Sequence, residues 1–228
     1  MVRRRGIPKG LSKKDLKRKQ QNNSEKDRIL IVCEGEKTEP GYLYKLVAEY
    51  RVPSAKVRVH GEGGAAPISV VEYAEDLLER DADFEHIFLV FDRDAHSTYE
   101  DAINKTNGFK KRRKLQSRNI EAITSIPCFE IWLLLHVSTS SKPYGKGVLG
   151  TPPGKQVIRD LRTHPAFINY EKSKIDFFDA IKDETDNAIM RAKRQVDQAR
   201  QAGAPLHHED SSSRFYLIVE TLQKIAAT

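Results

Sequence analysis

The fold is decided by the stretch Ile87-Phe88-Leu89-Val90-Phe91-Asp92-Arg93-Asp94. Its five apolar residues predict a central strand of a parallel sheet, because strands covered on both faces are almost continuously hydrophobic. Asp92 and Asp94 are two positions apart, so their side chains point the same way where the chain leaves the strand. The alternative for this pair is a turn, in which Asp is common. The stretch therefore predicts a buried strand whose carboxyl end presents two carboxylates.

Two more carboxylates follow apolar runs elsewhere in the chain. Glu34 follows Ile29-Leu30-Ile31-Val32-Cys33, and Glu130 follows Ile126-Pro127-Cys128-Phe129. Ligands of open α/β sheets bind beyond the carboxyl ends of the strands. Carboxylates gathered there repel one another unless a cation holds them, and Mg²⁺ or Mn²⁺ prefers oxygen ligands. This arrangement predicts a metal site and phosphate chemistry. The alternative for Glu34 is an acid at a helix N-terminus, and for Glu130 a helix cap or a buried ion pair.

Strands and helices alternate along the first part of the chain. We expect strands at about 28–33, 57–60, 87–91 and 120–123, and helices at about 38–50, from 67, at about 98–116 and at 129–137. This order predicts a three-layer α/β fold with a mainly parallel sheet. Further helices are expected at about 153–163, 172–201 and 211–226. We divide the chain into a flexible arm (1–26), an α/β core (27–138), and a linker with a helical extension packed on that core (139–228).

Composition indicates a soluble globular protein, with 39% hydrophobic and 31% charged residues. No apolar run is long enough to span a bilayer, and the N-terminus lacks an apolar signal region, so we expect a cytoplasmic protein without membrane contact. Cys33 and Cys128 lie in apolar runs and are expected to be buried free thiols. Trp132 and His136 follow on one apolar helix and are expected in the core.

Basic residues are unevenly distributed, and the net charge is +7. Residues 1–26 hold ten Lys or Arg against two acids. A second basic cluster follows at residues 110–114. Such blocks favour a polyanion through counterion release, whereas the alternatives are a solubilising tail and a solvated helix face. We favour nucleic acid for the second cluster because it follows directly on the acidic site. The candidate nucleic-acid-binding residues are Arg3, Arg4, Arg5, Lys13, Lys14, Lys110, Lys111, Arg112, Arg113 and Lys114.

These motifs carry a resemblance to known proteins. An apolar strand ending in Glu-Gly and a central strand ending in Asp-x-Asp resemble a Toprim domain. Most of the chain after residue 25 resembles the RloB-like family of bacterial defence proteins. The resemblance rests on Cys33-Glu34-Gly35-Glu36-Lys37-Thr38-Glu39, Phe91-Asp92-Arg93-Asp94-Ala95-His96 and Pro127-Cys128-Phe129-Glu130-Ile131-Trp132-Leu133-Leu134-Leu135-His136, and more weakly on 170–173, 188–193 and 215–219. Residues 208–213 depart from the family pattern and are interpreted as a cap of the last helix.

The resemblance implies a Toprim/Rossmann-like fold and a nuclease of an anti-phage or abortive-infection system that depends on one or two Mg²⁺ or Mn²⁺ ions. It implies that Asp92 and Asp94 hold metal and that Glu34 serves as general acid or base or joins the metal. Glu39 and Glu130 are the candidates to complete a second metal site. It also implies an ATPase partner of the ABC or AAA type, and no Walker A motif occurs in this chain.

Several flanking residues have two interpretations. Lys37 either neutralises charge in the transition state or is simply exposed. His96 either contacts phosphate and assists proton transfer or is an ordinary loop histidine. Lys172 and Lys193 either contact phosphates or lie on a solvated face. The substrate is DNA or a tRNA-like RNA; the alternative function is a non-catalytic nucleic-acid-binding subunit of a defence complex. Helices after residue 170 fit a homodimer interface and intrachain packing equally well.

Overall fold

The structure is a computed structural model, and it describes residues 27–228 except 62, 65, 94–95 and 146–149. Its centre is a five-stranded sheet with the order β2-β1-β3-β4-β5. The strands are β1 (Ile29–Cys33), β2 (Val57–His60), β3 (His86–Asp92), β4 (Asn119–Ile126) and β5 (Ser212–Ser213). The first four strands are parallel, and β5 runs antiparallel to β4. The mainly parallel sheet is thus confirmed.

Strands β1 and β3 are neighbours at the centre of the sheet. Every residue of β1 is buried, as are the five central residues of β3, which is why both runs are apolar in the sequence. The register pairs Ile29 with His86 and continues to Cys33 with Val90. The chain passes from β1 to β2 on one side of it and then crosses back to β3 on the other side. The carboxyl ends of β1 and β3 therefore form the switch point at which doubly wound sheets bind ligands.

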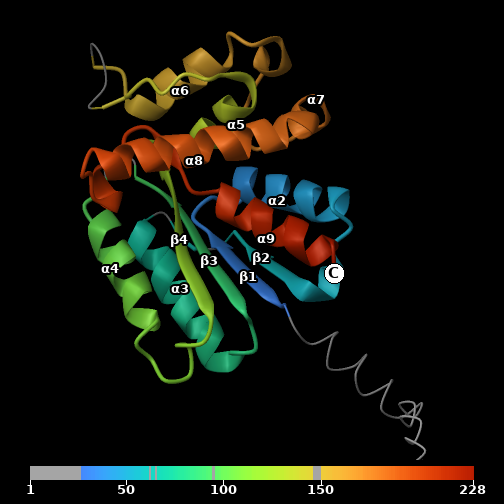
Figure 1. The fold of residues 1–228 in the computed structure, drawn as a ribbon, viewed down its shortest axis with the longest axis vertical. Helices are drawn as coiled ribbons and strands as arrows, with labels where there is room; N and C mark the ends of the chain where they lie inside the picture. The colour runs from blue at the N-terminus through green and yellow to red at the C-terminus, as the bar shows by residue number, and fades with distance from the viewer. Residues whose placement is uncertain (1–26, 62, 65, 94–95, 146–149) are drawn as a thin grey trace, which may run out of the picture.

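Helices cover both faces of the sheet (Figure 1). One face is covered by α3 (Pro67–Arg80) and α4 (Tyr99–Phe109), and the other by α2 (Thr38–Glu49) and α9 (Tyr216–Ala226). Alternation along β1 supplies both cores: Leu30 and Val32 join the α3–α4 side, whereas Ile29, Ile31 and Cys33 join the α2–α9 side. The three-layer, Rossmann-like α/β architecture that the sequence predicts is confirmed.

The remaining helices lie beyond the carboxyl end of the sheet (Figure 1). They are α5 (Glu130–Val137), α6 (Pro153–Leu161), α7 (Phe178–Ile181) and α8 (Thr185–Gln201). Short 3-10 turns occupy Ser54–Lys56, Pro165–Phe167, Lys182–Glu184 and Leu206–His208. Across the described ranges, no helix combines the length and apolar character that a membrane crossing demands.

Helix α5 is buried almost throughout, and its side chains tie the sheet to the C-terminal helices. Trp132 is fully buried, with ring centroids 5.0 Å from His136 and 5.5 Å from Phe215. His136 is buried as well; its Nδ1 lies 2.9 Å from the Trp132 carbonyl and its Nε2 lies 3.2 Å from the Tyr42 hydroxyl. Burial lowers the pKa of His136 to about 4. Trp132 and His136 are therefore core residues, as predicted, and Cys33 and Cys128 are buried free thiols.

Helix α4 is shorter than the expected span of about 98–116, because it ends at Phe109. Phe109 and Leu115 are both buried in the core below the α3–α4 face, and the basic residues between them are exposed. Gly108 also weakens the end of the helix, since glycine costs about 1 kcal/mol relative to alanine in a helix interior. The basic cluster is therefore a loop stretched between two buried anchors and not a helix face.

The C-terminal half differs from expectation in two places. The helix expected at 172–201 is interrupted: the chain forms the short α7, then the 3-10 turn Lys182–Glu184, and α8 begins at Thr185. No helix forms at the start of this span, where Ser173 has a positive φ of 77° and its amide donates to the Thr38 hydroxyl (3.0 Å). The helix expected at 211–226 begins at Tyr216, and the residues before it form β5. The Ser213 hydroxyl accepts the Phe215 amide proton at 3.3 Å, but no side chain caps α9, so the interpretation of residues 208–213 as a helix cap was wrong.

Candidate acidic crevice

The carboxyl ends of β1 and β3 bring Glu34 and Asp92 together. The Glu34 amide donates to the Val90 carbonyl (2.9 Å), which extends the pairing of β1 with β3 by one residue. The Asp92 amide then donates to Glu34 Oε2 at 3.1 Å. The amide of Phe129, in the loop after β4, donates to Asp92 Oδ2 at 3.0 Å. Backbone amides at the ends of β3 and β4 thus orient two carboxylates in one crevice.

Glu39 reaches the same crevice from the first turn of α2. Its carboxylate lies against Gly35, where any side chain would collide with the Glu39 oxygens. This close approach gives a physical reason for the glycine that follows Glu34. Burial, followed by the nearby carboxylates of Glu130 and Glu34, raises the pKa of Glu39. Glu39 is therefore an acidic group with an elevated affinity for protons, and by the same physics it favours any cation that replaces a proton.

Glu130 opens α5 and is 1% exposed. The Tyr170 hydroxyl donates to Glu130 Oε1 at 3.0 Å, and Lys172 Nζ lies 3.3 Å from the same oxygen. Within the described part of the chain, Glu130 Oε2 has no hydrogen-bond partner. The side chain does not cap α5. Of the two alternatives to a metal ligand, the structure therefore contains the buried ion pair and not the cap.

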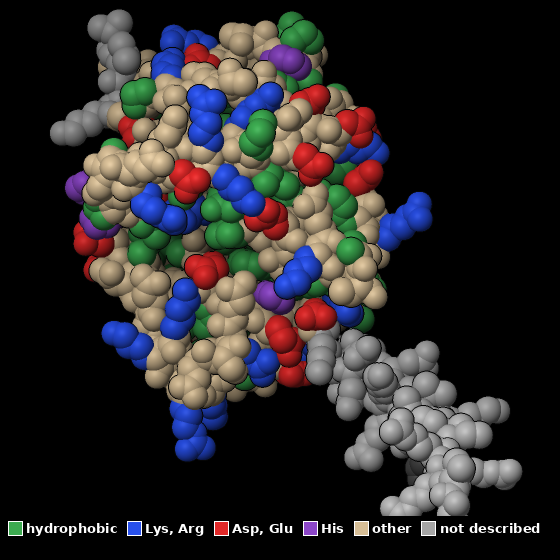
Figure 2. All heavy atoms as spheres, viewed as in Figure 1, with side chains coloured by type: hydrophobic (Ala, Val, Ile, Leu, Met, Phe, Trp, Pro, Cys, Tyr) green, Lys and Arg blue, Asp and Glu red, His purple; other side chains and the backbone are tan. Residues whose placement is uncertain are grey.

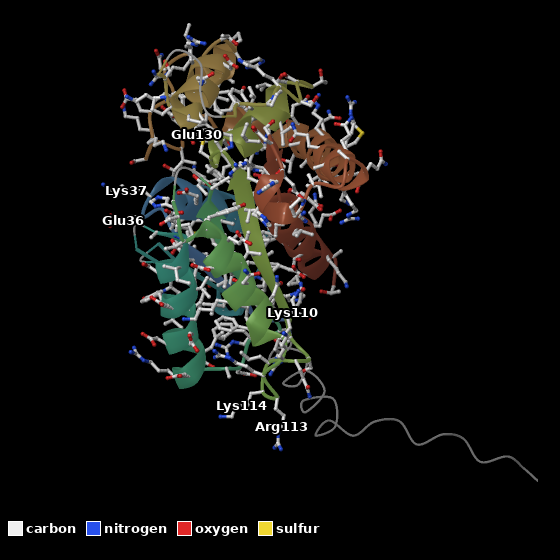
Figure 3. All side chains as sticks on the ribbon, turned by 90° about the vertical axis from the view of Figure 1, so that its left-hand side faces the viewer. Glu36, Lys37, Lys110, Arg113, Lys114 and Glu130 are labelled. Carbon is white, nitrogen blue, oxygen red and sulfur yellow. The ribbon has the colours of Figure 1, made fainter. Side chains whose placement is uncertain are left out.

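A pocket of about 360 Å³ is shared by Glu39 and Glu130, whereas Glu34 and Asp92 are not among the residues that line it. Its lining consists of Gly35, Glu36, Lys37, Thr38, Glu39, Phe129, Glu130, Lys172 and Ser173. Figure 3 shows Glu36 and Lys37 at the outer edge of the molecule and Glu130 on α5. Lys37 is exposed and lines the pocket, so its position is consistent with both interpretations made from the sequence.

His96 lies beside Glu34, with 3.6 Å between His96 Nε2 and Glu34 Oε1. Its side chain is 38% exposed, so it faces both the carboxylate and solvent. Asp94, the second aspartate of the pair, lies outside the described residues. His96 is thus a loop residue at the edge of the crevice, a position compatible with both interpretations made from the sequence.

The donor chemistry of the crevice suits a hard divalent cation. Its side chains offer carboxylate oxygens, and one of them, Glu130 Oε2, is buried without a hydrogen bond from any described residue. Unpaired buried carboxylate oxygens are costly, and Mg²⁺ or Mn²⁺ would satisfy them. Among the described residues, which do not include Asp94, no group of three His, Cys, Asp or Glu side chains could hold a metal ion. The fit to a divalent ion is therefore one of donor type alone: carboxylate oxygens are the ligands that Mg²⁺ and Mn²⁺ prefer.

Tyr170 is the residue of this site that sequence reasoning missed, and the contact of Lys172 with Glu130 was not expected either. Both lie in a turn that is distant in sequence from Glu130 but touches it in space. The signal was present in the weaker family segment at 170–173, but no periodicity or spacing links that turn to the strand ends. Lys193, in contrast, forms an ion pair with Glu220 on α9.

The basic cluster lies at the other end of the molecule. Figure 3 shows Lys110, Arg113 and Lys114 far from Glu130, and Figure 2 shows Lys and Arg side chains projecting where the loop between α4 and β4 lies. Helix α4 carries the chain back along the sheet, so residues that follow the acidic site in sequence end at the amino edge of the strands. The argument from closeness in sequence was therefore wrong.

Ion pairs also reduce the charge of this cluster. Lys110 Nζ lies 3.3 Å from Glu121, and Arg112 binds Glu75. Lys111, Arg113 and Lys114 are exposed and form no ion pair with another described residue. The other candidate nucleic-acid-binding residues lie outside the described part of the chain: Arg3, Arg4, Arg5, Lys13 and Lys14.

Fold and site together define a class: a three-layer, Rossmann-like α/β protein with an acidic crevice at the switch point of its sheet. A family model described as RloB-like protein matches residues 29–222. The chain therefore belongs to the RloB-like family, as its motifs predicted, and this membership suggests a defence-associated protein. Neither the curated proteins nor the solved structures contain a match to the chain.

Proposed function

We propose that this protein is a Mg²⁺- or Mn²⁺-dependent nuclease of a bacterial anti-phage defence system, with a Toprim-type site that hydrolyses phosphodiester bonds in DNA or RNA. The observation that carries the proposal is the meeting of Glu34 and Asp92 at adjacent carboxyl ends of β1 and β3, where backbone amides orient both carboxylates. Membership of the RloB-like family supports the defence role.

Asp92 and Glu34, together with Asp94, would hold the first ion, and Glu130 and Glu39 would contribute to a second. A bound ion would polarise the phosphoryl oxygen and lower the pKa of a water molecule. The carboxylates supply the negative charge that such an ion needs, and the hydrogen bonds from Asp92 and Phe129 amides keep two of them in position before any ligand arrives.

Other residues of the crevice have roles that follow from their surroundings. Glu34 Oε2 accepts the Asp92 amide, which leaves Oε1 directed toward His96 and suited to exchange a proton with it. Burial and the neighbouring carboxylates raise the pKa of Glu39, so a cation bound beside it would relieve the cost of its negative charge. Exposed Lys37, at the edge of the pocket, is placed to neutralise a phosphate.

The proposed system includes further components. The chain carries no Walker A motif, so an ABC- or AAA-type ATPase would be a separate partner. DNA and tRNA-like RNA share the phosphate chemistry that this crevice recognises, and the proposed cellular compartment is the cytoplasm, where both are present. A non-catalytic nucleic-acid-binding subunit is the competing function, and the experiment below separates the two.

Cleavage is expected to require a divalent ion and Glu34. The full-length protein, alone and with an ABC- or AAA-type ATPase from the same genome neighbourhood, is incubated with plasmid DNA and total tRNA in Mg²⁺, Mn²⁺ or EDTA. We expect cleavage with either metal, none in EDTA, and none with Glu34→Gln, which keeps the shape of the side chain but removes its charge. Cleavage that persists in EDTA or in this variant rejects the proposed site. Binding without cleavage under every condition favours the non-catalytic function.

The basic loop is expected to affect binding and not the chemical step, because it lies far from the crevice. Replacing Lys111, Arg113 and Lys114 with alanine removes the three cations of the loop that lack ion pairs with described residues. If they contact phosphates, the slope of log K against log salt should fall by up to about 3, since each phosphate contact contributes about 0.9. Single-turnover cleavage at saturating protein should remain unchanged. An unchanged salt slope removes the loop from the nucleic-acid interface.

A further inference from the structure

The acidic crevice contains a lysine that the proposed chemistry does not use. Lys172 Nζ lies 3.3 Å from Glu130 Oε1, which also accepts the Tyr170 hydroxyl. Partial burial lowers the pKa of Lys172, but the Glu130 carboxylate outweighs it, so the pKa lies above its ordinary value. The ammonium group of Lys172 is therefore paired with the carboxylate that opens α5.

The carboxylate that this lysine contacts is incompletely satisfied. Glu130 is 1% exposed, and its Oε2 receives no hydrogen bond from a described residue although Oε1 receives the Tyr170 hydroxyl and the lysine. A single ammonium on one oxygen leaves the second oxygen buried and unpaired, which is costly. A divalent oxygen-seeking ion in the same pocket would satisfy the carboxylate better.

The lysine side chain is free to leave, whereas the turn that carries it is fixed. The Lys172 side chain is 61% exposed, so its ammonium can return to water without moving the backbone. The next residue, Ser173, has a φ of 77° and donates its amide proton to Thr38 Oγ1 at 3.0 Å. Tyr170 is 3% exposed and anchors the other side of the turn. An arriving cation would thus displace one side chain and not a loop.

We propose that Lys172 is the resident cation of this site: its ammonium neutralises Glu130 in the metal-free protein, and a divalent ion that binds Glu130 displaces it. Tyr170 is a positioning residue that holds Glu130 in both states. The inference rests on the metal dependence of the proposed function. It adds a competition between Lys172 and the metal ion for Glu130, which the function itself does not require. In this proposal Lys172 lowers the affinity of the site for a divalent ion, whereas a lysine that assists metal binding would raise it.

The test is Mn²⁺ binding to the full-length protein, measured by isothermal titration calorimetry and by the rise in Tm with Mn²⁺. In Lys172→Met, which keeps an unbranched apolar stem, we expect about tenfold tighter Mn²⁺ binding, within the usual range of coupling between competing ligands. We also expect a lower Tm without metal and a larger gain in Tm on adding Mn²⁺. Lys172→Arg, which retains the charge, should bind Mn²⁺ like the wild type.

Two further variants serve as controls. Lys182→Met removes another ion-paired lysine, bound to Glu49 at 3.0 Å outside the crevice, and should leave Mn²⁺ affinity unchanged. In a Glu130→Gln background, Lys172→Met should no longer change the Tm of the metal-free protein, because the pair has lost its negative member. Equal or weaker Mn²⁺ binding by Lys172→Met overturns the resident-cation proposal and leaves the metal-dependent function intact. Absence of Mn²⁺ binding in the wild type and in every variant overturns both.

Discussion

Replacing Asp92 with asparagine should reduce the rate of nucleic-acid cleavage at least about a thousandfold, equivalent to about 4 kcal/mol of lost transition-state stabilisation. The substitution preserves the side-chain oxygen that accepts the Phe129 amide at 3.0 Å, so the local backbone has no reason to move. It removes the negative charge at the carboxyl end of β3 and replaces the other carboxylate oxygen with an NH2 group of similar size. The loss would therefore measure what a charged carboxylate contributes at the switch point, at nearly constant side-chain shape.

Two measurements accompany this variant. Its Tm should equal or exceed that of the wild type, because removing a like charge beside Glu34 relieves repulsion in the crevice. Asp76→Asn, which changes an exposed aspartate on α3, should cleave at the wild-type rate. If Asp92→Asn retains more than a tenth of the wild-type rate while remaining folded, Asp92 does not hold an essential ion.

The second large effect concerns stability. Replacing Trp132 with alanine should lower the free energy of unfolding by about 3–5 kcal/mol, the usual cost of truncating a large aromatic core residue. Trp132 is fully buried and packs against His136 on its own helix and Phe215 just before α9. Its removal would leave a cavity at the junction of the sheet, α5 and the C-terminal helices, where three parts of the core meet.

Chemical denaturation followed by circular dichroism measures this loss, since Trp132 is the only tryptophan and its removal abolishes tryptophan fluorescence. The matched control is Met190→Ala on α8, because Met190 is 60% exposed. That change should stay within about 0.5 kcal/mol of the wild type. Equal effects of the two substitutions would show that the core does not depend on the α5 junction.

Local sequence signals predicted the strands and the crevice because the acids of the crevice directly follow the apolar runs that form the strands. The apolar runs before Glu34 and Asp92 are buried on both faces, and parallel strands necessarily bring their carboxyl ends to one edge. Trp132 was predictable from helical spacing. Other features depend on contacts that no local pattern encodes: the end of α4 is set by the burial of Phe109 and Leu115, and β5 is two residues long, too short for any alternation.

The same reason explains the incomplete prediction of the site. The contact of Tyr170 with Glu130 spans 40 positions, and neither residue belongs to a periodic element that would indicate the other. The basic cluster shows the opposite error, because closeness in sequence to Asp92 became distance in space once α4 reversed the direction of the chain. The prediction that Glu34 and Asp92 meet at adjacent strand ends is confirmed, whereas contacts between separate elements needed the structure.

The position of β5 has a consequence for synthesis of the protein. Ser212 and Ser213 pair with Ile126 and Ser125, directly before the loop whose amide orients Asp92. The Arg93 guanidinium also donates to the carbonyl of Glu209, so the residue beside Asp92 depends on the late segment as well. Domains fold as units while the ribosome adds residues in order. A nascent chain thus carries Glu34 and Asp92 long before it receives Ser212 and Ser213, the strand that completes the sheet beside them.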